Sequence, residues 1–352
     1  MGRLADGQGA RGAPGVDREG LVLAARRGRR RRGPAAPVAA LDLGTNNCRL
    51  LIAAPARGAG GTLRIVDSFS RIVRLGEGLA QSGMLSDAAI ERTVAALKIC
   101  AEHLAAKKVG RLRAVATQAC RQAGNAQVLV DRARAEAGIA LEIISAEEEA
   151  RLASVGCAPL IDPHAAGALI FDIGGGSTEV IWMRRGGAGA PPRAIASASE
   201  PVGVVSLAES GGAADRAGFE AMRAAMIARF EPVHRRMAAL GAFDAGAHHL
   251  LGTSGTVTTL AALAMNLPRY DRAKVDASWH DCSAILAVID RLVDTDLKGR
   301  AAMGPVGADR ADLIVPGCAL FAAIYTLWPC ARLRVADRGL REGMLRELLG
   351  LR

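Results

Sequence analysis

Three consecutive glutamates, Glu147 to Glu149, lie in the segment ISAEEEARLASVG (144–156) and are the clearest candidates for acid–base chemistry. Ser145 and Glu148 have the spacing of a capping box, which would bind Glu148 to backbone amides at a helix start. Successive helical residues point about 100° apart, so either Glu147 or Glu149 can face a cleft. A carboxylate kept ionised by a helix N-terminus suits a general base, while the alternative is that these residues only complement the helix dipole.

Two segments of the chain share one pattern around an aspartate. The segment LDLGTNNCRLLI (41–52) aligns without a gap on FDIGGGSTEVIW (171–182), so that Asp42 matches Asp172 and Gly44 matches Gly174. Each segment predicts a hairpin whose tip exposes backbone N–H groups, which can bind an anion without a lysine. Two copies 130 residues apart predict a duplicated fold with a cleft between its halves.

A third candidate anion-binding loop lies in HLLGTSGTVTTLAALA (249–264), where an expected strand turns into a helix. Backbone amides at a helix N-terminus favour anions, although an ordinary strand-to-helix turn would leave the same pattern. Thr117 and Arg121 stand at another strand-to-helix junction. The fork of Arg121 matches phosphate oxygens, with a surface ion pair as the alternative. There is no GxxxxGK[ST] motif, and His280-Asp281 lacks the partners of a metal-dependent phosphohydrolase, so we expect it to be structural.

The segments between the two hairpins alternate in type. Ser86 and Asp87 open a helix with apolar residues at steps of three and four, and residues 107–110 close it. Strands are expected at 113–117 and 141–145, with a helix over 125–137 that ends at Gly138. This order predicts an α/β domain, and the 352-residue length favours two domains.

The first 37 residues contain nine arginines and three acidic residues, so they carry +6 of the chain's net charge of +10. A block of like charge among Gly, Ala and Pro predicts disorder, either as an electrostatic arm for polyanions or as an inert leader. An export signal is not expected, because Asp42 interrupts the apolar stretch that follows.

Residues 313–331 lack any charge, but Pro316, Gly317 and Pro329 should limit the helix to about eleven residues, too short for a bilayer. A buried core helix is expected there instead. The seven cysteines form no CxxC pair and predict free thiols in a reducing cytosol.

Six motifs in this order resemble the Ppx/GppA phosphatase family of exopolyphosphatases and guanosine pentaphosphate phosphatases. The motifs are ALDLGTNNCRLLI, VATQACRQAGNA, IISAEEEARLASVG, LIFDIGGGSTEVIW, LLGTSGTVTTLAAL and VADRGLREGML, within residues 38–350. The resemblance implies the α/β, duplicated two-domain fold of actin, Hsp70 and sugar kinases, which is ribonuclease H-like and has an interdomain cleft. It implies a first domain of residues 38–146 plus 338–352, a second of residues 147–337, and a short form of the family without a further C-terminal domain.

The resemblance also implies roles for individual residues. Glu149 would activate water and Arg121 would contact phosphate, while a divalent cation, Mg²⁺, would be held near Asp172 and Glu179 with Asp42 as an accessory ligand. A monovalent cation such as K⁺ is a further candidate cofactor. The implied phosphate-binding residues are Gly44, Thr45, Asn46, Asn47, Thr117, Gly174, Gly175, Gly176, Ser177, Gly252, Thr253, Ser254, Gly255 and Thr256.

A few positions depart from the family pattern without losing small or polar character. Thr45 and Asn47 stand where the family often has Ser, Cys48 where an aromatic residue is common, and Ala146 and Ser254 where Gly is frequent. These departures affect the expected geometry more than the expected chemistry.

The expected reaction is hydrolysis of a terminal phosphoanhydride. Inorganic polyphosphate is favoured as substrate because the chain is only 3% aromatic and has a basic arm, and guanosine pentaphosphate (pppGpp) is the alternative. An actin-like or sugar-kinase-like ATP-binding protein and an inactive polyanion sensor are rival classes. We expect neither a specific nucleic acid nor a membrane as a partner. We also expect a cytoplasmic location, and a homodimer is possible from the sequence.

Overall fold

The computed structural model describes residues 36–56, 63–186, 190–211, 215–241, 243 and 246–351. The predicted disordered leader therefore lies, apart from residues 36 and 37, outside the described residues. Residues Ala36–Arg352 form one compact unit. The proposed division of this unit into two domains stays a prediction.

The first half of this unit is built on a five-stranded sheet in the order β3-β2-β1-β4-β5. Neighbouring strands β1 and β2, and β2 and β3, are antiparallel, whereas β4 and β5 run parallel to β1. The strands are β1 (Val38–Leu43), β2 (Asn47–Pro55), β3 (Leu63–Ile72), β4 (Arg111–Ala116) and β5 (Glu142–Ile143).

The second half contains a six-stranded sheet in the order β10-β11-β9-β6-β7-β8. Its strands are β6 (Gly167–Ile173), β7 (Thr178–Arg184), β8 (Arg193–Glu200), β9 (His248–Thr253), β10 (Trp279–Asp281) and β11 (Arg332–Ala336). From β8 to β11 the pairing repeats that of the first sheet, and β10 adds an antiparallel edge strand. The structure thus confirms the duplicated α/β fold that the two Asp-Gly hairpins predict.

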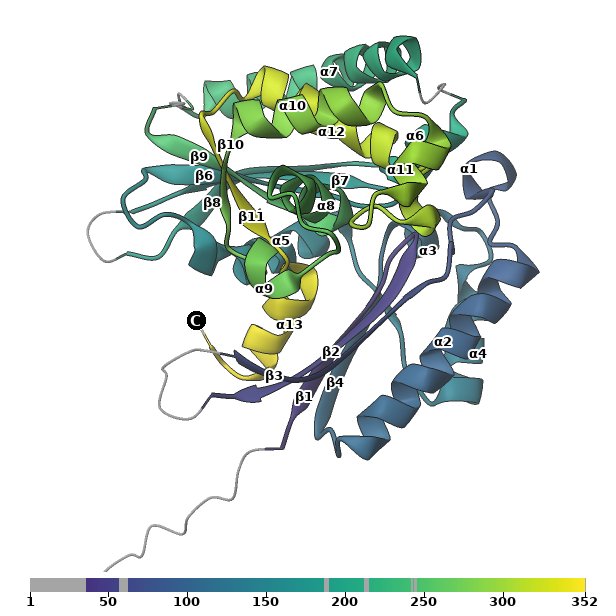
Figure 1. Ribbon diagram of the computed structural model, residues 1–352. Helices are drawn as coiled ribbons and strands as arrows, with labels where there is room; N and C mark the ends of the chain where they lie inside the picture. The colour runs from purple at the N-terminus through teal and green to yellow at the C-terminus, as the bar shows by residue number, and fades with distance from the viewer. Residues whose placement is uncertain are drawn as a thin grey trace, which may run out of the picture. The chain divides into compact units, whose positions relative to one another are not determined.

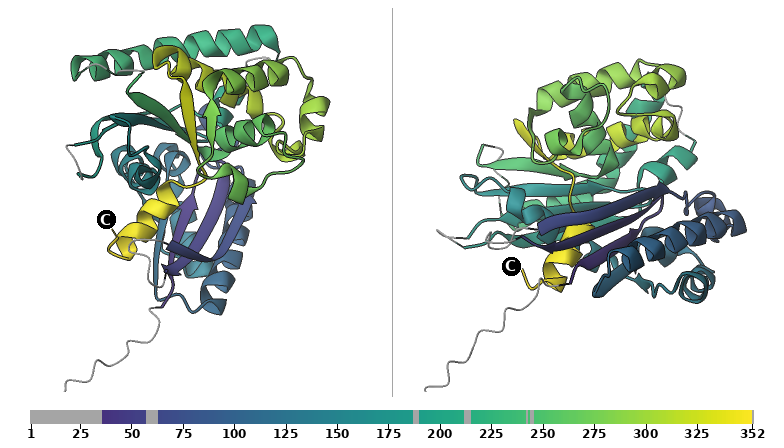
Figure 2. Two further views of the ribbon diagram at one scale, coloured as in Figure 1. Left: turned by 60° about the vertical axis from the view of Figure 1, so that its left-hand side comes forward. Right: turned by 60° about the horizontal axis from the view of Figure 1, so that its bottom comes forward.

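Helices cover both sheets and also fill the space between them (Figures 1 and 2). The helices are α1 (Leu79–Ser82), α2 (Asp87–Ala106), α3 (Gln118–Gln122), α4 (Ala126–Ala137), α5 (Ala146–Cys157), α6 (Val204–Glu209), α7 (Arg216–Ala239), α8 (Ser254–Ala264), α9 (Arg272–Val275), α10 (Cys282–Val293), α11 (Leu297–Ala302), α12 (Ile314–Leu327) and α13 (Leu340–Leu348), with two 3-10 helices, η1 (Ala158–Leu160) and η2 (Ala308–Arg310). Strands β4 and β5 and helices α2 and α4 match the expected elements within two residues at each end.

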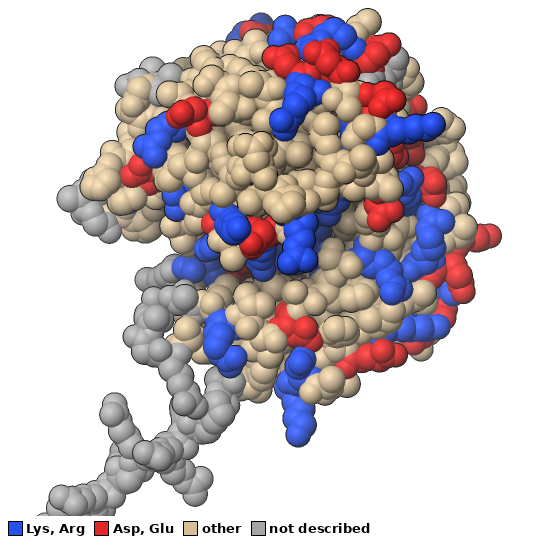
Figure 3. Space-filling view, viewed as in Figure 1, with Lys and Arg blue, Asp and Glu red and all other residues tan. Residues whose placement is uncertain are grey.

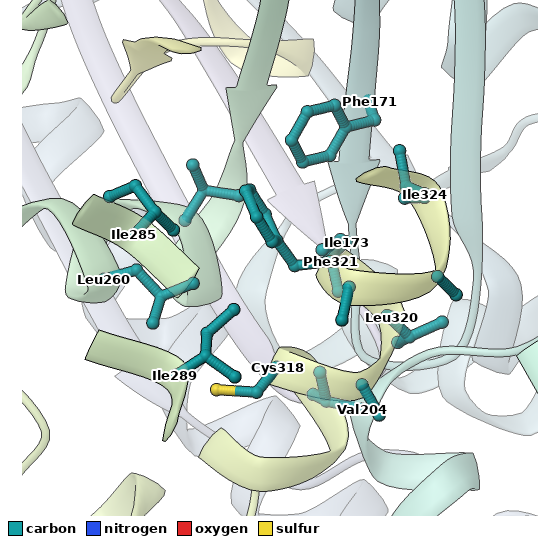
Figure 4. Packing of buried hydrophobic residues seen from close by; sticks show 14 of the residues in the cluster. Phe171, Ile173, Val204, Leu260, Ile285, Ile289, Cys318, Leu320, Phe321 and Ile324 are labelled. Carbon is teal, nitrogen blue, oxygen red and sulfur yellow. The ribbon is translucent and has the colours of Figure 1, made fainter. Parts of the chain in front are cut away.

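Alternating side chains of each central strand enter different cores, as strand geometry requires. In β1, Ala39 and Leu41 pack towards α2 and α4, whereas Val38 and Ala40 pack towards α13. In β6, Leu169 and Phe171 join the large core beneath α7, α8, α10 and α12. Figure 4 shows part of this core, where Phe171 lies near Phe321 of α12. Both sheets are therefore buried on their two faces near the hairpins.

Helices α5 and α13 lie between the two sheets and touch each other at glycines. A Cβ on Gly156 would lie 2.0 Å from the Gly339 carbonyl oxygen, and one on Gly343 would lie 2.1 Å from that of Leu152. Met344 and Leu345 of α13 pack on the first sheet. Helix α13 thus packs on the sheet that contains β1.

The uncharged stretch around residue 320 forms a longer helix than expected. Helix α12 has 14 residues and contains Pro316 and Gly317, so the expectation that they shorten it to about eleven is wrong. Pro316 falls in the first turn, where its missing N–H has no helical partner to lose. No helix in the described part of the chain is long and apolar enough to cross a membrane.

Candidate active site

The two predicted hairpin loops and the start of α8 converge on one cleft of about 130 Å³. Figure 3 shows a hollow across the middle of the molecular surface in this view, with basic side chains beside it. Most of the predicted site residues line the cleft. They are Asp42, Gly44, Thr45, Asn46, Asn47, Thr117, Glu149, Asp172, Gly174, Gly175, Gly176, Ser177, Glu179, Ser254, Gly255 and Thr256.

The first and second loops are in direct contact, which explains the glycines of the second. A Cβ on Gly175 would lie 3.1 Å from Cβ of Thr45, and one on Gly176 would lie 2.5 Å from Oγ1 of Thr45. No side chain at these two positions would leave Thr45 in place. The loops therefore interlock, with the side chain of Thr45 lying against bare backbone.

The third loop contributes less of its length to the cleft than expected. Gly252 packs beneath Phe171, and Oγ1 of Thr253 donates a 2.8 Å hydrogen bond to the Arg338 carbonyl, so neither residue lines the cleft. Ser254, at a position where the family often has Gly, adopts a φ of 87°, in the left-handed region that disfavours a side chain. Its buried hydroxyl has no partner among the described residues.

The two matching aspartates face opposite kinds of charge across their hairpins. Asp42 pairs in register with Arg49, and Asp172 pairs with Glu179. Burial raises the pKa of Asp172 to about 6 against the attraction of Arg49, and it also raises the pKa of Asp42. Glu179 accepts a 2.7 Å hydrogen bond from Ser199, yet burial and the charges of Glu149 and Asp172 raise its pKa well above the usual value.

Glu149 is the glutamate of the acidic triplet that reaches the cleft. Its side chain is 15% exposed and forms a 2.7 Å ion pair with Arg121. Burial outweighs the attraction of Arg121 and, with the charges of Asp42 and Asp172, raises the pKa of Glu149 to about 7. A pKa close to neutral pH suits a general base.

Arg121 lies beside this base but does not line the cleft. Its guanidinium donates to Glu149, to the side-chain oxygen of Gln118 and to the Ile144 carbonyl. In this structure it orients Glu149, and its predicted contact with phosphate stays a prediction.

The neighbouring glutamates have other roles. The Ser145 hydroxyl accepts the Glu148 N–H at 3.2 Å, but the Glu148 carboxylate binds Arg113 and Arg151. The predicted second half of the capping box is therefore wrong, because two guanidiniums compete for that carboxylate. Glu147 is exposed, and its pKa is lowered by hydrogen bonds at the helix start.

Two arginines of the cleft were not found from the sequence. Arg49 and Arg310 both line it, and neither guanidinium has a hydrogen-bond partner among the described residues. Arg310 lies near the third loop, since a Cβ on Gly255 would be 3.6 Å from its Nη1. The position of Arg49 opposite Asp42 in the hairpin was the one signal available in the sequence.

The oxygen-bearing side chains of the cleft suit a divalent cation bound jointly by protein and substrate oxygens better than a cation surrounded by protein ligands alone. In the described residues no three or more acidic, His or Cys side chains lie close enough together to hold an ion. Mg²⁺, however, usually binds to one or two carboxylates together with water molecules and phosphate oxygens. Four buried oxygens lining the cleft lack a partner within the described chain and could face such an ion or its water, namely those of Asn46, Asn47, Ser254 and Thr259.

A duplicated α/β fold with three loops around one cleft defines a protein of the actin-like class. The model of the Ppx/GppA phosphatase family matches residues 52–351, and the chain belongs to this family. It is 35% identical over 289 residues to exopolyphosphatase 2 of Mycobacterium tuberculosis, covering 80% of this chain and 87% of that protein.

Solved structures show the same relationship. A family member from Aquifex aeolicus superposes with a TM-score of 0.72 at 30% identity and covers 89% of this chain and 98% of its own. An exopolyphosphatase from Cytophaga hutchinsonii gives a TM-score of 0.77 at 25% identity, with 90% and 99% covered. These likenesses support a phosphatase with the predicted actin-like fold.

Proposed function

We propose that this protein is an exopolyphosphatase, which removes orthophosphate from the end of an inorganic polyphosphate chain by hydrolysis. The observation that carries the proposal is Glu149, a largely buried carboxylate with a pKa of about 7 on the wall of a cleft to which three amide-rich loops contribute. The relatives from M. tuberculosis and C. hutchinsonii, which carry the name exopolyphosphatase, support it.

The loops and arginines of the cleft would bind the chain end. Backbone N–H groups in the two hairpin tips and at the start of α8 offer hydrogen bonds to phosphate oxygens without needing a lysine. Arg49 and Arg310 add two cations on the cleft wall. Hydrogen bonds between charged groups are about twice as strong as neutral ones, so these arginines favour a substrate with several phosphate charges.

Glu149 would act as the base in the chemical step. It takes a proton from a water molecule as the water oxygen bonds to the terminal phosphorus and the bridging P–O bond breaks. The shortened chain leaves with the electrons of that bond, and the terminal group becomes orthophosphate. Arg121 holds the carboxylate in place through the 2.7 Å ion pair.

Asp172 and Glu179, with Asp42 nearby, would hold a divalent cation such as Mg²⁺. When bound, such an ion neutralises charge on the phosphate oxygens. A monovalent cation such as K⁺ as a further cofactor stays a prediction.

Two features of the cleft favour polyphosphate over pppGpp. No aromatic side chain of the described residues lines it, so a guanine base would have no stacking partner there. Its volume of about 130 Å³ is also below the roughly 300–1,000 Å³ of pockets that enclose whole drug-sized ligands. The cleft fits a phosphate terminus and leaves any base outside.

The deciding experiment compares kcat/KM for short polyphosphate, long polyphosphate and pppGpp on one preparation of the full chain with Mg²⁺. We expect the higher value for polyphosphate. A clear preference for pppGpp over both chain lengths would overturn this substrate assignment and leave the hydrolytic mechanism standing.

We also propose that the protein works in the cytoplasm. Its seven cysteines are all free and buried, which suits a reducing compartment. The homodimer stays a prediction.

A further inference from the structure

The first phosphate loop, residues 44–47, is called loop 1. It is supported by a turn of the same half, residues 73–78, which we call the loop-1 support. The backbone N–H groups of Val73 and Arg74 both donate to the Asn46 carbonyl, at 2.9 and 3.0 Å. The Gly76 N–H donates to the Thr45 carbonyl at 2.9 Å. A shift of this turn would therefore move loop 1.

The second phosphate loop, residues 174–177, is called loop 2 and is supported by helix α6 of the other half. The N–H groups of Val204 and Val205 donate to the carbonyls of Gly174 and Gly175, at 3.0 and 2.8 Å. Gly203 fits so closely that a Cβ would lie 2.4 Å from the Gly175 carbonyl carbon. Helix α6 and loop 2 should consequently move as one unit.

One hydrogen bond joins the two supports across the halves. Glu209, the last residue of α6, accepts the backbone N–H of Gly78 through Oε1 at 3.0 Å, although 131 residues separate the two. Its Oε2 is buried and has no partner among the described residues. The bond thus involves a partly desolvated carboxylate, which makes it stronger than a neutral hydrogen bond.

We propose that Glu209 is a positioning residue that fixes the separation of the two phosphate loops. It forms a continuous connection from loop 1 through the loop-1 support to α6 and loop 2, while it does not line the cleft itself. A substrate that must contact both loops binds best when this connection is made. The inference rests on the proposed phosphate-binding function of the cleft.

A second contact across the same halves provides a matched control. Arg74 and Asp312 approach to 3.7 Å, but their side chains are 43% and 45% exposed. Exposed pairs of this kind contribute little, because water screens them and both side chains lose freedom. Asp312, like Glu209, is an acidic residue of the second half that reaches the loop-1 support.

The test measures kcat, KM and melting temperature for the full chain carrying Glu209→Ala, Glu209→Gln or Asp312→Ala, with tripolyphosphate as the probe. Calorimetry measures the Kd of tripolyphosphate in parallel. For Glu209→Ala we expect KM and Kd to rise about 10-fold while kcat stays within about twofold, because saturating substrate, by contacting both loops, restores their separation.

Glu209→Gln keeps an oxygen that can accept the Gly78 N–H, so KM should return to within about threefold of wild type. Asp312→Ala should change KM by less than about twofold. If Glu209→Ala lowers the melting temperature but leaves KM and Kd unchanged, Glu209 is only structural and the inference is overturned.

The binding measurement separates this inference from the proposed activity. If wild type binds tripolyphosphate but hydrolyses neither polyphosphate nor pppGpp, the proposed function fails, while an increase in Kd for Glu209→Ala still supports the positioning role. A wild-type chain that neither binds nor hydrolyses tripolyphosphate would overturn both.

Discussion

The hairpin β1–β2 and the hairpin β6–β7 have the same topology and register but opposite electrostatics. At equivalent positions Asp42 faces Arg49 and Asp172 faces Glu179. The first hairpin therefore balances its own carboxylate, whereas the second places two carboxylates together. In the proposed mechanism, the cationic wall of the first half would bind phosphate and the acidic wall of the second would hold a metal.

The tips of the two hairpins also differ in bulk. Loop 1 contains one glycine and the side chains of Thr45, Asn46 and Asn47, whereas loop 2 has three consecutive glycines. Because the Thr45 side chain lies against Gly175 and Gly176, the side chains of loop 1 leave room only for glycine at these positions of loop 2. The two copies are complementary surfaces rather than equivalent ones.

Among variants of the loops and hairpins, the largest expected effect comes from the glycines that support the loops. A Cβ on Gly203 would meet three backbone atoms of loop 2 within 2.6 Å, whereas one on Gly76 would approach the Cγ2 atom of the Thr45 side chain most closely. Overpacking costs about 1–3 kcal/mol, and backbone cannot yield as a side chain can. Gly203→Ala should therefore lower kcat/KM for polyphosphate by about 100-fold, and Gly76→Ala by about 10-fold or less. Equal losses would show that the two loops are equally adaptable.

The acidic pair of the second hairpin should control metal dependence. Glu179→Gln removes one carboxylate beside Asp172, and we expect the Mg²⁺ concentration for half-maximal activity to rise roughly 10–100-fold, with KM for polyphosphate at saturating Mg²⁺ changing much less. Titration of activity with Mg²⁺, together with calorimetry of Mg²⁺ binding, measures this. An unchanged Mg²⁺ requirement would remove Glu179 from the metal site.

The arginine at the equivalent position of the first hairpin should instead control substrate affinity. Arg49→Gln deletes a cation from the cleft wall and should raise KM for polyphosphate about 10-fold, while the Mg²⁺ requirement stays near that of wild type. Steady-state kinetics at several Mg²⁺ concentrations separates the two effects. If Arg49→Gln and Glu179→Gln gave the same kinetic pattern, the electrostatic contrast between the hairpins would have no functional meaning.

The sequence was sufficient for features that repeat or that follow local rules. The matched aspartates predicted the duplicated sheets, whereas helical direction left both Glu147 and Glu149 able to face the cleft and only the family resemblance pointed to Glu149. The capping serines and Gly138 gave helix ends within a residue or two. Such signals depend on neighbours in the chain, which a single sequence displays.

What the sequence did not reveal depends on contacts between distant segments. Gly76 and Gly203 matter because a distant loop leaves no room for a Cβ, through the Thr45 side chain at Gly76 and through backbone atoms at Gly203. Arg310 reaches the cleft from η2, and Arg121 turns to Glu149 only because α5 brings that carboxylate to it. Local sequence patterns cannot predict these long-range contacts, since each residue of such a pair has no distinctive sequence context of its own.

The raised pKa of Glu149 gives the proposed reaction a characteristic dependence on pH. The base works as the carboxylate, so kcat/KM should rise as pH increases through about 7 and then level off. Stability should change in the opposite direction. A folded-state pKa above the unfolded value favours folding at low pH, and this contribution is lost as pH rises through about 7.

The most direct test of the central claim is the turnover of polyphosphate by Glu149→Gln from pH 6 to 8, with Glu147→Gln as the matched control. Loss of general-base catalysis should lower kcat about 10²–10⁴-fold while tripolyphosphate still binds, and the rise in kcat/KM through pH 7 should disappear. Glu147→Gln, on the exposed side of the same helix turn, should keep both the rate and the pH profile. Wild-type turnover with an unchanged pH profile in Glu149→Gln would contradict the assignment of Glu149 as the base.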